Sequence, residues 1–155
     1  MDTALDTIDL EILDILQHDA RLAQSALGTR VGLSTAAVNR RMRRLTDSGV
    51  ITGSAVTVAP EKLGRPVTVI VHIAVESEQL DILDEVRSSF VDCRQVQQCY
   101  YVAGEWDFVL ILMVRDMQEY TELTRQLFFA NDNVRRFSTH VVMDRAKATL
   151  TVPTR

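Results

Sequence analysis

The spacing of apolar residues changes partway along this chain of 155 residues, and that change limits the folds open to it. Before Pro60, apolar side chains recur every three or four positions, which is typical of helices with one buried face. After Pro66 they alternate or form short continuous runs, which is typical of strands. Residues 60–66, bounded by the two prolines, are interpreted as a linker. The pattern predicts an α+β protein with a helical domain at residues 1–59 and a sheet-forming domain at residues 67–155.

The apolar residues of the first domain fit three helices. The first is expected to be capped by Asp6, and its apolar stripe comprises Leu5, Ile8, Ile12, Ile15 and Leu16. The second is expected over Gln24–Val31, and the third begins with Ser34 as its cap and stops at Gly49. A Gly-Leu-Ser turn joins these two helices, which indicates a helix-turn-helix. The stretch from Val50 to Val58 is interpreted as a small β-hairpin, or wing.

The second domain alternates strands and helices in the order β-α-β-β-α-β, which predicts a ferredoxin-like fold with both helices on one sheet face. The strands are expected at residues 67–75, 95–103, 108–114 and 134–143, and the helices at residues 80–90 and 117–127. The third strand, Phe108–Val114, is apolar throughout, so the face without helices also needs a cover. A second copy of the chain is the expected cover, which predicts a homodimer. A cover made by the C-terminal tail from Lys147 to Pro153 is the alternative.

Charge is distributed unevenly along this chain, whose net charge is −4. Residues 1–20 hold six acidic side chains and no lysine or arginine, whereas residues 21–50 hold six arginines and one acidic side chain. Four of these arginines fall within the five positions from Arg40 to Arg44, in the third predicted helix. A basic helix in an acidic protein indicates a polyanion as partner, and double-stranded DNA is the leading interpretation.

The third helix is expected to meet DNA with one face only. On a helical wheel Val38, Met42 and Leu45 point toward the core, and Arg40 lies almost opposite them. In a helix-turn-helix, residues at the start of this helix read bases while basic residues hold phosphates. The residues expected to contact DNA are Ser34, Thr35, Ala36, Asn39, Arg40, Arg43 and Arg44. Arg41 lies near the buried edge and is expected to pair with the acidic first helix; a merely solvated helix face is the alternative reading.

Composition excludes several other classes of protein. No apolar run approaches the ~20 residues that a membrane span needs, and the acidic N-terminus is unlike a secretory signal. A cytoplasmic protein without membrane contact is therefore expected. Cys93 and Cys99 are too few for a disulfide framework, and no nearby histidine or cysteine pair completes a zinc site. Reduced thiols, no metal and no cofactor are expected.

The whole chain resembles the Lrp/AsnC (feast/famine) family of transcription regulators. The motifs that carry the resemblance are LDTIDLEIL (5–13), RVGLS (30–34), VNRRMRRL (38–45), GVITG (49–53) and GEWD (104–107). The resemblance implies an N-terminal winged helix-turn-helix, a C-terminal ligand-sensing domain, dimers that assemble into octamers, and an amino acid effector bound between dimers. Gly28 and Ser54 depart from the family pattern, and Gly28 is expected to weaken its helix by up to ~1 kcal/mol relative to alanine.

A turn in the second domain is the candidate effector site. The residues expected to line it are Val102, Ala103, Gly104, Glu105, Trp106 and Asp107, with Ser138 and Thr139 from the last strand. Gly104 lets the backbone approach a small ligand, Trp106 offers an apolar wall, and Asp107 is suited to a ligand ammonium group. An ordinary turn, in which Asp107 accepts from local N–H groups, is the alternative.

Two other functions remain open at the level of sequence. An architectural DNA-binding protein without an effector would share every feature of the first domain. Siroheme decarboxylases resemble this family in fold and depend on histidines near the turn, but His18, His72 and His140 all lie outside it. No triad or paired-carboxylate arrangement is evident, so an enzyme is not expected.

Overall fold

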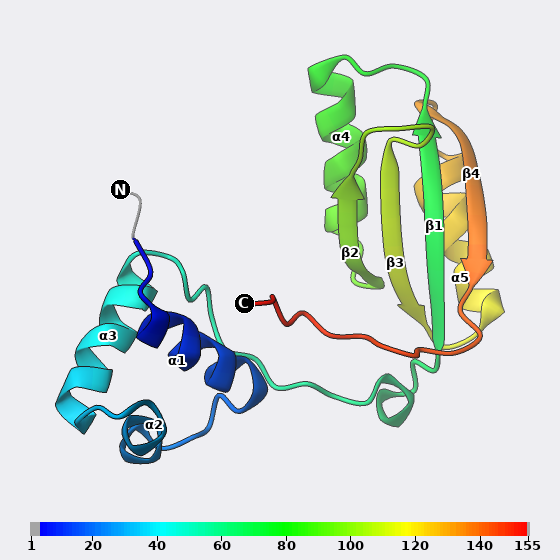
Figure 1. Ribbon diagram of the computed structural model, residues 1–155. Helices are drawn as coiled ribbons and strands as arrows, with labels where there is room; N and C mark the ends of the chain where they lie inside the picture. The colour runs from blue at the N-terminus through cyan, green and yellow to red at the C-terminus, as the bar shows by residue number, and fades with distance from the viewer. Residues whose placement is uncertain (1–3, 155) are drawn as a thin grey trace. The chain divides into compact units, whose positions relative to one another are not determined.

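The computed structural model describes residues 4–154, which divide into two compact units (Figure 1). The first unit combines residues up to Thr57 with the tail from Lys147, and the second runs from Val58 to Ala146. The tail groups with the first unit because the Gln17 side chain binds its backbone: Nε2 donates to the Val152 carbonyl (3.0 Å) and Oε1 accepts from the Val152 N–H (2.7 Å). This grouping differs from the expected boundary at residues 67–155.

The first unit contains the three predicted helices. They are α1 (Thr7–His18), α2 (Gln24–Val31) and α3 (Thr35–Asp47). Asp6 and Asp9 cap α1 reciprocally, since each carboxylate accepts from the other residue's N–H. Ser34 Oγ accepts from the Ala37 N–H and so begins α3. The helices enclose a small apolar core of Ile12, Leu27, Val31, Val38 and Leu45.

The expected hairpin over Val50–Val58 is not formed: the described residues of this stretch contain no β-strand. Ile51 still attaches to α3, because its N–H donates to the Leu45 carbonyl (3.0 Å). Beyond it, residues 52–59 belong to no helix or strand, and Val56 and Val58 are 69% and 58% exposed. A β-prone stretch becomes a strand only when another strand pairs with it, and no strand among residues 4–154 does so.

The second unit has the predicted ferredoxin-like order of elements. It begins with a single 3₁₀ turn, η1 (Pro60–Leu63), and continues with β1 (Val67–Val75), α4 (Leu80–Val91), β2 (Val96–Tyr101), β3 (Phe108–Val114), α5 (Met117–Thr124), its π-helical extension η2 (Arg125–Phe129) and β4 (Val134–Val141). The four strands form one antiparallel sheet in the order β2-β3-β1-β4, so β1 and β3 lie in the middle as predicted.

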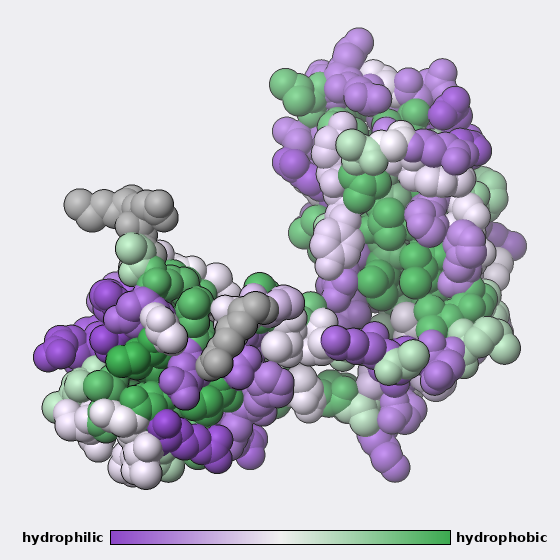
Figure 2. Space-filling view, viewed as in Figure 1, coloured by the Kyte–Doolittle hydropathy of each residue, from purple (hydrophilic) through white to green (hydrophobic). Residues whose placement is uncertain are grey.

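The two faces of this sheet differ in how fully they are covered. Val69, Val71 and Ile73 of β1 pack with the helices into a core that also holds Phe90, Phe108 and Phe128. The opposite face carries apolar side chains that are only partly buried, namely Ile70, Val109, Ile111 and Met113. Figure 2 shows this hydrophobic surface gathered over the middle strands. One face of the sheet is therefore covered by helices and forms a hydrophobic core, and the other face has no helix over it.

Candidate functional site

The outward face of α3 carries an open hollow. It is lined by Ala36, Asn39, Arg40, Arg43, Arg44, Asp47 and Ser48. Thr35, Ala36 and Asn39 are exposed near the start of the helix, and Arg40 and Arg43 are exposed further along it. Among the described residues, no carboxylate lies within ion-pair distance of Arg40 or Arg43. Small and polar groups at the start of the helix, followed by free guanidinium groups, suit a base edge and its flanking phosphates respectively.

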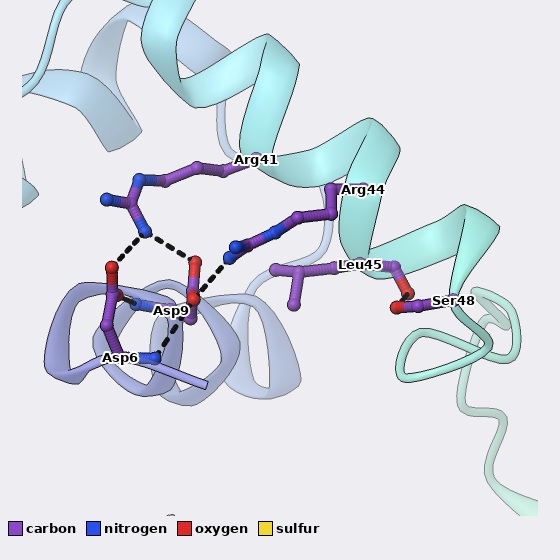
Figure 3. Close-up of polar contacts among 6 residues, drawn as sticks. All are labelled: Asp6, Asp9, Arg41, Arg44, Leu45 and Ser48. Atoms are coloured by element: carbon purple, nitrogen blue, oxygen red, sulfur yellow. Dashed lines mark hydrogen bonds and ion pairs between the residues drawn. The ribbon is translucent and has the colours of Figure 1, made fainter. Parts of the chain in front are cut away.

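The other two arginines of the run face α1 (Figure 3). Arg41 Nη1 lies 2.7 Å from Asp6 Oδ2 and 2.7 Å from Asp9 Oδ1, as predicted for this residue. Arg44 Nη2 pairs with Asp9 Oδ2, a contact that the sequence analysis did not foresee when it grouped Arg44 with the DNA contacts. We name these four residues, Asp6, Asp9, Arg41 and Arg44, the α1–α3 clamp.

Burial and pairing act in opposite directions on Asp9. Its side chain is 0% exposed, and burial alone would raise the pKa of its carboxyl group. Hydrogen bonds from the Asp6 N–H, Arg41 and Arg44 outweigh burial, so the pKa of Asp9 falls below its usual value. The hydrogen bond from Arg41 is the main cause that lowers the pKa of the exposed Asp6. Both carboxylates of the clamp are therefore charged at neutral pH.

The turn between β2 and β3 is attached to β1 through Asp107. The Asp107 N–H donates to the Ile73 carbonyl (2.8 Å), and its carboxylate Oδ2 accepts from the Val75 N–H (2.7 Å). The N–H group that the Asp107 carboxylate binds therefore lies on β1, 32 positions away in the chain, and not within the turn itself. Asp107 Oδ1 has no hydrogen-bond donor among the described residues, so one carboxylate oxygen is still available.

The same turn presents a run of free N–H groups. Within residues 4–154, the N–H groups of residues 103–106 donate to no protein acceptor. Gly104 sits at φ +143°, where a side chain would be strained, and a Cβ there would meet nothing within 4 Å. Glu105 pairs with Arg136 at 2.9 Å, and the same guanidinium lies 4.3 Å from the centroid of the Trp106 ring. The turn is fixed by side chains, while its backbone donors stay open.

The two hydroxyl residues of β4 point in opposite directions. Thr139 lies opposite Val71 on the helix-covered face, and its hydroxyl is 2.5 Å from the Tyr120 hydroxyl. Ser138 lies opposite His72 on the helix-free face. Thr139 and Ser138 therefore lie on opposite faces of the sheet, because neighbouring strand residues alternate between faces.

His72 lies beside Trp106 of the turn, and His140 lies beside His72. The His72 ring is 5.8 Å from that of Trp106 and 5.1 Å from that of His140. His72 Nδ1 is buried without a hydrogen-bond partner among the described residues. The sequence could have placed these two histidines together, because their strands are neighbours in the predicted sheet. Side chains that occupy the same phase of the in–out alternation on paired strands lie on the same face.

Two family profiles divide the chain between them. A profile for winged helix-turn-helix DNA-binding domains matches residues 5–52, and the profile of the Lrp/AsnC ligand binding domain matches residues 68–152. This chain belongs to the Lrp/AsnC family. It is accordingly a DNA-binding transcriptional regulator with a ligand-binding domain, and not an enzyme.

Family members similar to this chain span almost its whole length. An uncharacterised helix-turn-helix transcriptional regulator of Sinorhizobium fredii is 45% identical over 96% of this chain and 88% of its own. The leucine-responsive regulatory protein of Haemophilus influenzae is 34% identical over 94% of this chain and 88% of its own.

Solved structures of the Lrp/AsnC family superimpose on this fold. An AsnC family regulator from Agrobacterium tumefaciens, 30% identical, has a TM-score of 0.91 over 96% of this chain and 97% of its own. A regulator of Neisseria meningitidis in complex with L-Met, 25% identical, has a TM-score of 0.90 over 97% of each chain.

No helix in the described part of this family member is long and apolar enough to cross a membrane. Its cysteines, Cys93 and Cys99, are free and partly buried. Burial raises the pKa of the Cys99 thiol, against a smaller opposite effect of Arg87. A protonated, partly buried thiol is a poor nucleophile.

Proposed function

We propose that this regulator recognises specific operator sequences with the outward face of α3. The proposal rests on how exposed side chains are distributed along this helix. Thr35, Ala36 and Asn39 are exposed near its start. Arg40 and Arg43 follow, and neither has a carboxylate partner among the described residues. Ser34 contributes mainly as the cap. Asn39 is suited to a two-point contact with adenine, and the arginines are suited to phosphates or guanine. Such a protein acts where the DNA is, which supports a cytoplasmic location.

The DNA proposal is tested by measuring operator and random-sequence DNA binding over a range of salt concentrations. Arg40→Ala should weaken binding to both DNAs and flatten the dependence of log affinity on log salt by about 0.9. Asn39→Ala should weaken operator binding by about 1–3 kcal/mol and leave random DNA nearly unaffected. Arg87→Ala, which removes an arginine paired with Asp84 in the second unit, is the control and should change neither. Equal losses on both DNAs for Asn39→Ala would contradict base reading.

We further propose that the turn at residues 102–107 binds an amino acid or a related metabolite. Open N–H groups at residues 103–106 suit a ligand carboxylate, and the available Oδ1 of Asp107 suits its ammonium group. Trp106 and Ser138 would then flank the ligand on the helix-free side. The complex of the Neisseria meningitidis relative with L-Met supports this class of effector.

A thermal-shift screen of the twenty amino acids tests the effector proposal. Asp107→Asn is the informative variant, because asparagine keeps an acceptor for the Val75 N–H but loses the negative charge. Wild type should be stabilised by at least one amino acid, and Asp107→Asn should lose that shift. Equal shifts in both proteins would remove Asp107 from the site. Absence of any shift, together with DNA affinity that no amino acid changes, would favour the architectural alternative.

We propose that the helix-free face of the sheet is covered by a second copy of the chain, and that such dimers assemble further, up to octamers. Partly buried apolar residues on the two middle strands support a cover there, and the tail groups with the other unit. A dimer would also present two α3 helices to successive turns of DNA.

A further inference from the structure

Asp9 is an unusual partner for a DNA-binding helix, because it is a fully buried carboxylate bound by two arginines of that helix. Its Oδ1 accepts from Arg41 at 2.7 Å, and its Oδ2 accepts from Arg44 and from the Asp6 N–H at 3.1 Å. Figure 3 shows both guanidinium groups reaching back from α3 to the start of α1. When a buried carboxylate loses a charged partner, the free-energy cost of removing it from water is no longer offset by that ion pair, and the fold is destabilised.

The clamp divides the four arginines of the run into two kinds. Arg40 and Arg43 have no ion-pair partner in the described part of the chain, whereas Arg41 and Arg44 are both held by Asp9. Arg41 is 22% exposed and does not line the hollow on the outward face of α3. Arg44 is 45% exposed and lines the same hollow as Arg40 and Arg43. Its guanidinium is thus within the DNA-facing region, but it is directed toward Asp9.

We propose that Asp9 is an intramolecular counterion that withholds Arg44 from the DNA backbone and thereby sets how strongly α3 binds DNA of any sequence. A phosphate at the surface would have to compete for Arg44 with a carboxylate that water does not reach. Since each phosphate contact adds affinity without adding sequence information, withholding one favours discrimination over affinity. Asp9 acts through Arg44 and is a positioning residue, not a DNA contact.

Single arginine variants give the first test, with binding to a random-sequence duplex measured from about 50 to 200 mM salt. Arg43→Ala should flatten the slope of log affinity against log salt by about 0.9, as one phosphate contact is lost. Arg44→Ala should leave that slope unchanged, although it also removes a positive charge. Equal flattening by the two variants would overturn the proposal, because it would place Arg44 on a phosphate.

Releasing Arg44 gives the second test. Asp9→Asn keeps the shape of the side chain and an acceptor for the Asp6 N–H, but it frees the guanidinium of Arg44. The slope should steepen by about 0.9, so that the loss of affinity between about 50 and 200 mM salt grows three- to fourfold. Adding Arg44→Ala to Asp9→Asn should return the slope to its wild-type value. A merely structural role of Asp9 would lower thermal stability but could not steepen the slope.

The matched control is Asp6→Asn, which removes a clamp carboxylate that binds Arg41 but not Arg44. Its slope should equal that of wild type. Circular dichroism establishes that each variant is folded before binding is compared. If Asp9→Asn is folded and its slope is unchanged, the proposal is wrong; if it does not fold, the comparison of Arg44→Ala with Arg43→Ala still decides.

Discussion

Glu119 shows how a single buried carboxylate organises the second unit. It is 8% exposed and accepts from Arg65 Nη1 at 2.6 and 2.8 Å, from the Gln95 side chain at 3.0 Å and from the Arg115 N–H at 2.7 Å. Burial raises the pKa of this carboxyl group, but the hydrogen bonds outweigh it and lower the pKa from its ordinary 4.5 to about 2. The three partners come from the linker, the start of β2 and the end of β3, so Glu119 joins them to α5.

The depressed pKa of Glu119 predicts a dependence of stability on pH. Its contribution should be complete above pH 4.5 and should disappear as the pH falls toward 2. Glu119→Gln should lower the free energy of unfolding at pH 7 by about 3 kcal/mol and should reduce the slope of stability between these pH values. Trp106, the sole tryptophan, reports unfolding of this unit by fluorescence. Glu122→Gln, on an exposed face of α5, is the control, and a similar loss in both variants would contradict the assignment.

At the scale of elements, Gly28 illustrates packing that overrides helix propensity. By helix propensity alone, Gly28 is expected to weaken α2 relative to alanine. In the structure, a Cβ at Gly28 would lie 2.5 Å from the Leu33 carbonyl oxygen. The Leu33 N–H also donates to the Gly28 carbonyl (2.8 Å). The turn between α2 and α3 therefore passes directly over Gly28, and this close approach leaves no room for a side chain.

Gly28→Ala should consequently destabilise the protein, although alanine is the better helix former. We expect a loss of about 1–3 kcal/mol, the usual range for overpacking, instead of a gain of up to ~1 kcal/mol. Urea unfolding followed by helical circular dichroism measures it. Ser25→Ala, at an exposed position of the same helix, should be neutral or slightly stabilising. An increase in stability for Gly28→Ala would show that the turn can shift to admit a methyl group.

At the scale of the whole molecule, the helix-free sheet face carries a prediction about assembly. Ile111 is on the central strand β3, partly buried and opposite Ile70 of β1. Ile111→Glu should convert the expected dimer into monomers, because a dimer interface there would have to bury an unpaired charge. Sedimentation velocity measures the change. Val91→Glu, at a 62% exposed position on α4, is the control and should remain dimeric; a dimer in both variants would place the interface elsewhere.

Local sequence patterns are enough to predict the helices, the four strands of the sheet, their order and the caps of α1 and α3. Each of these depends on hydrophobic period or on residues a few positions apart, such as Asp6 with Asp9 and Ser34 with Ala37. The sequence also placed Arg41 against α1, because helical geometry alone puts that residue at the buried edge of α3.

Pairs of groups that are far apart in the chain are instead set by the way the elements pack. Arg44 lies 35 positions from Asp9, Arg65 lies 54 from Glu119, and Gln17 lies 135 from Val152. The face that Thr139 occupies and the close approach of Leu33 to Gly28 likewise follow from packing. Such contacts depend on strand register and on the angles at which elements meet, and a one-residue shift exchanges one set of partners for another. The four arginines at positions 40–44 look alike in sequence, and their different partners were set by the fold.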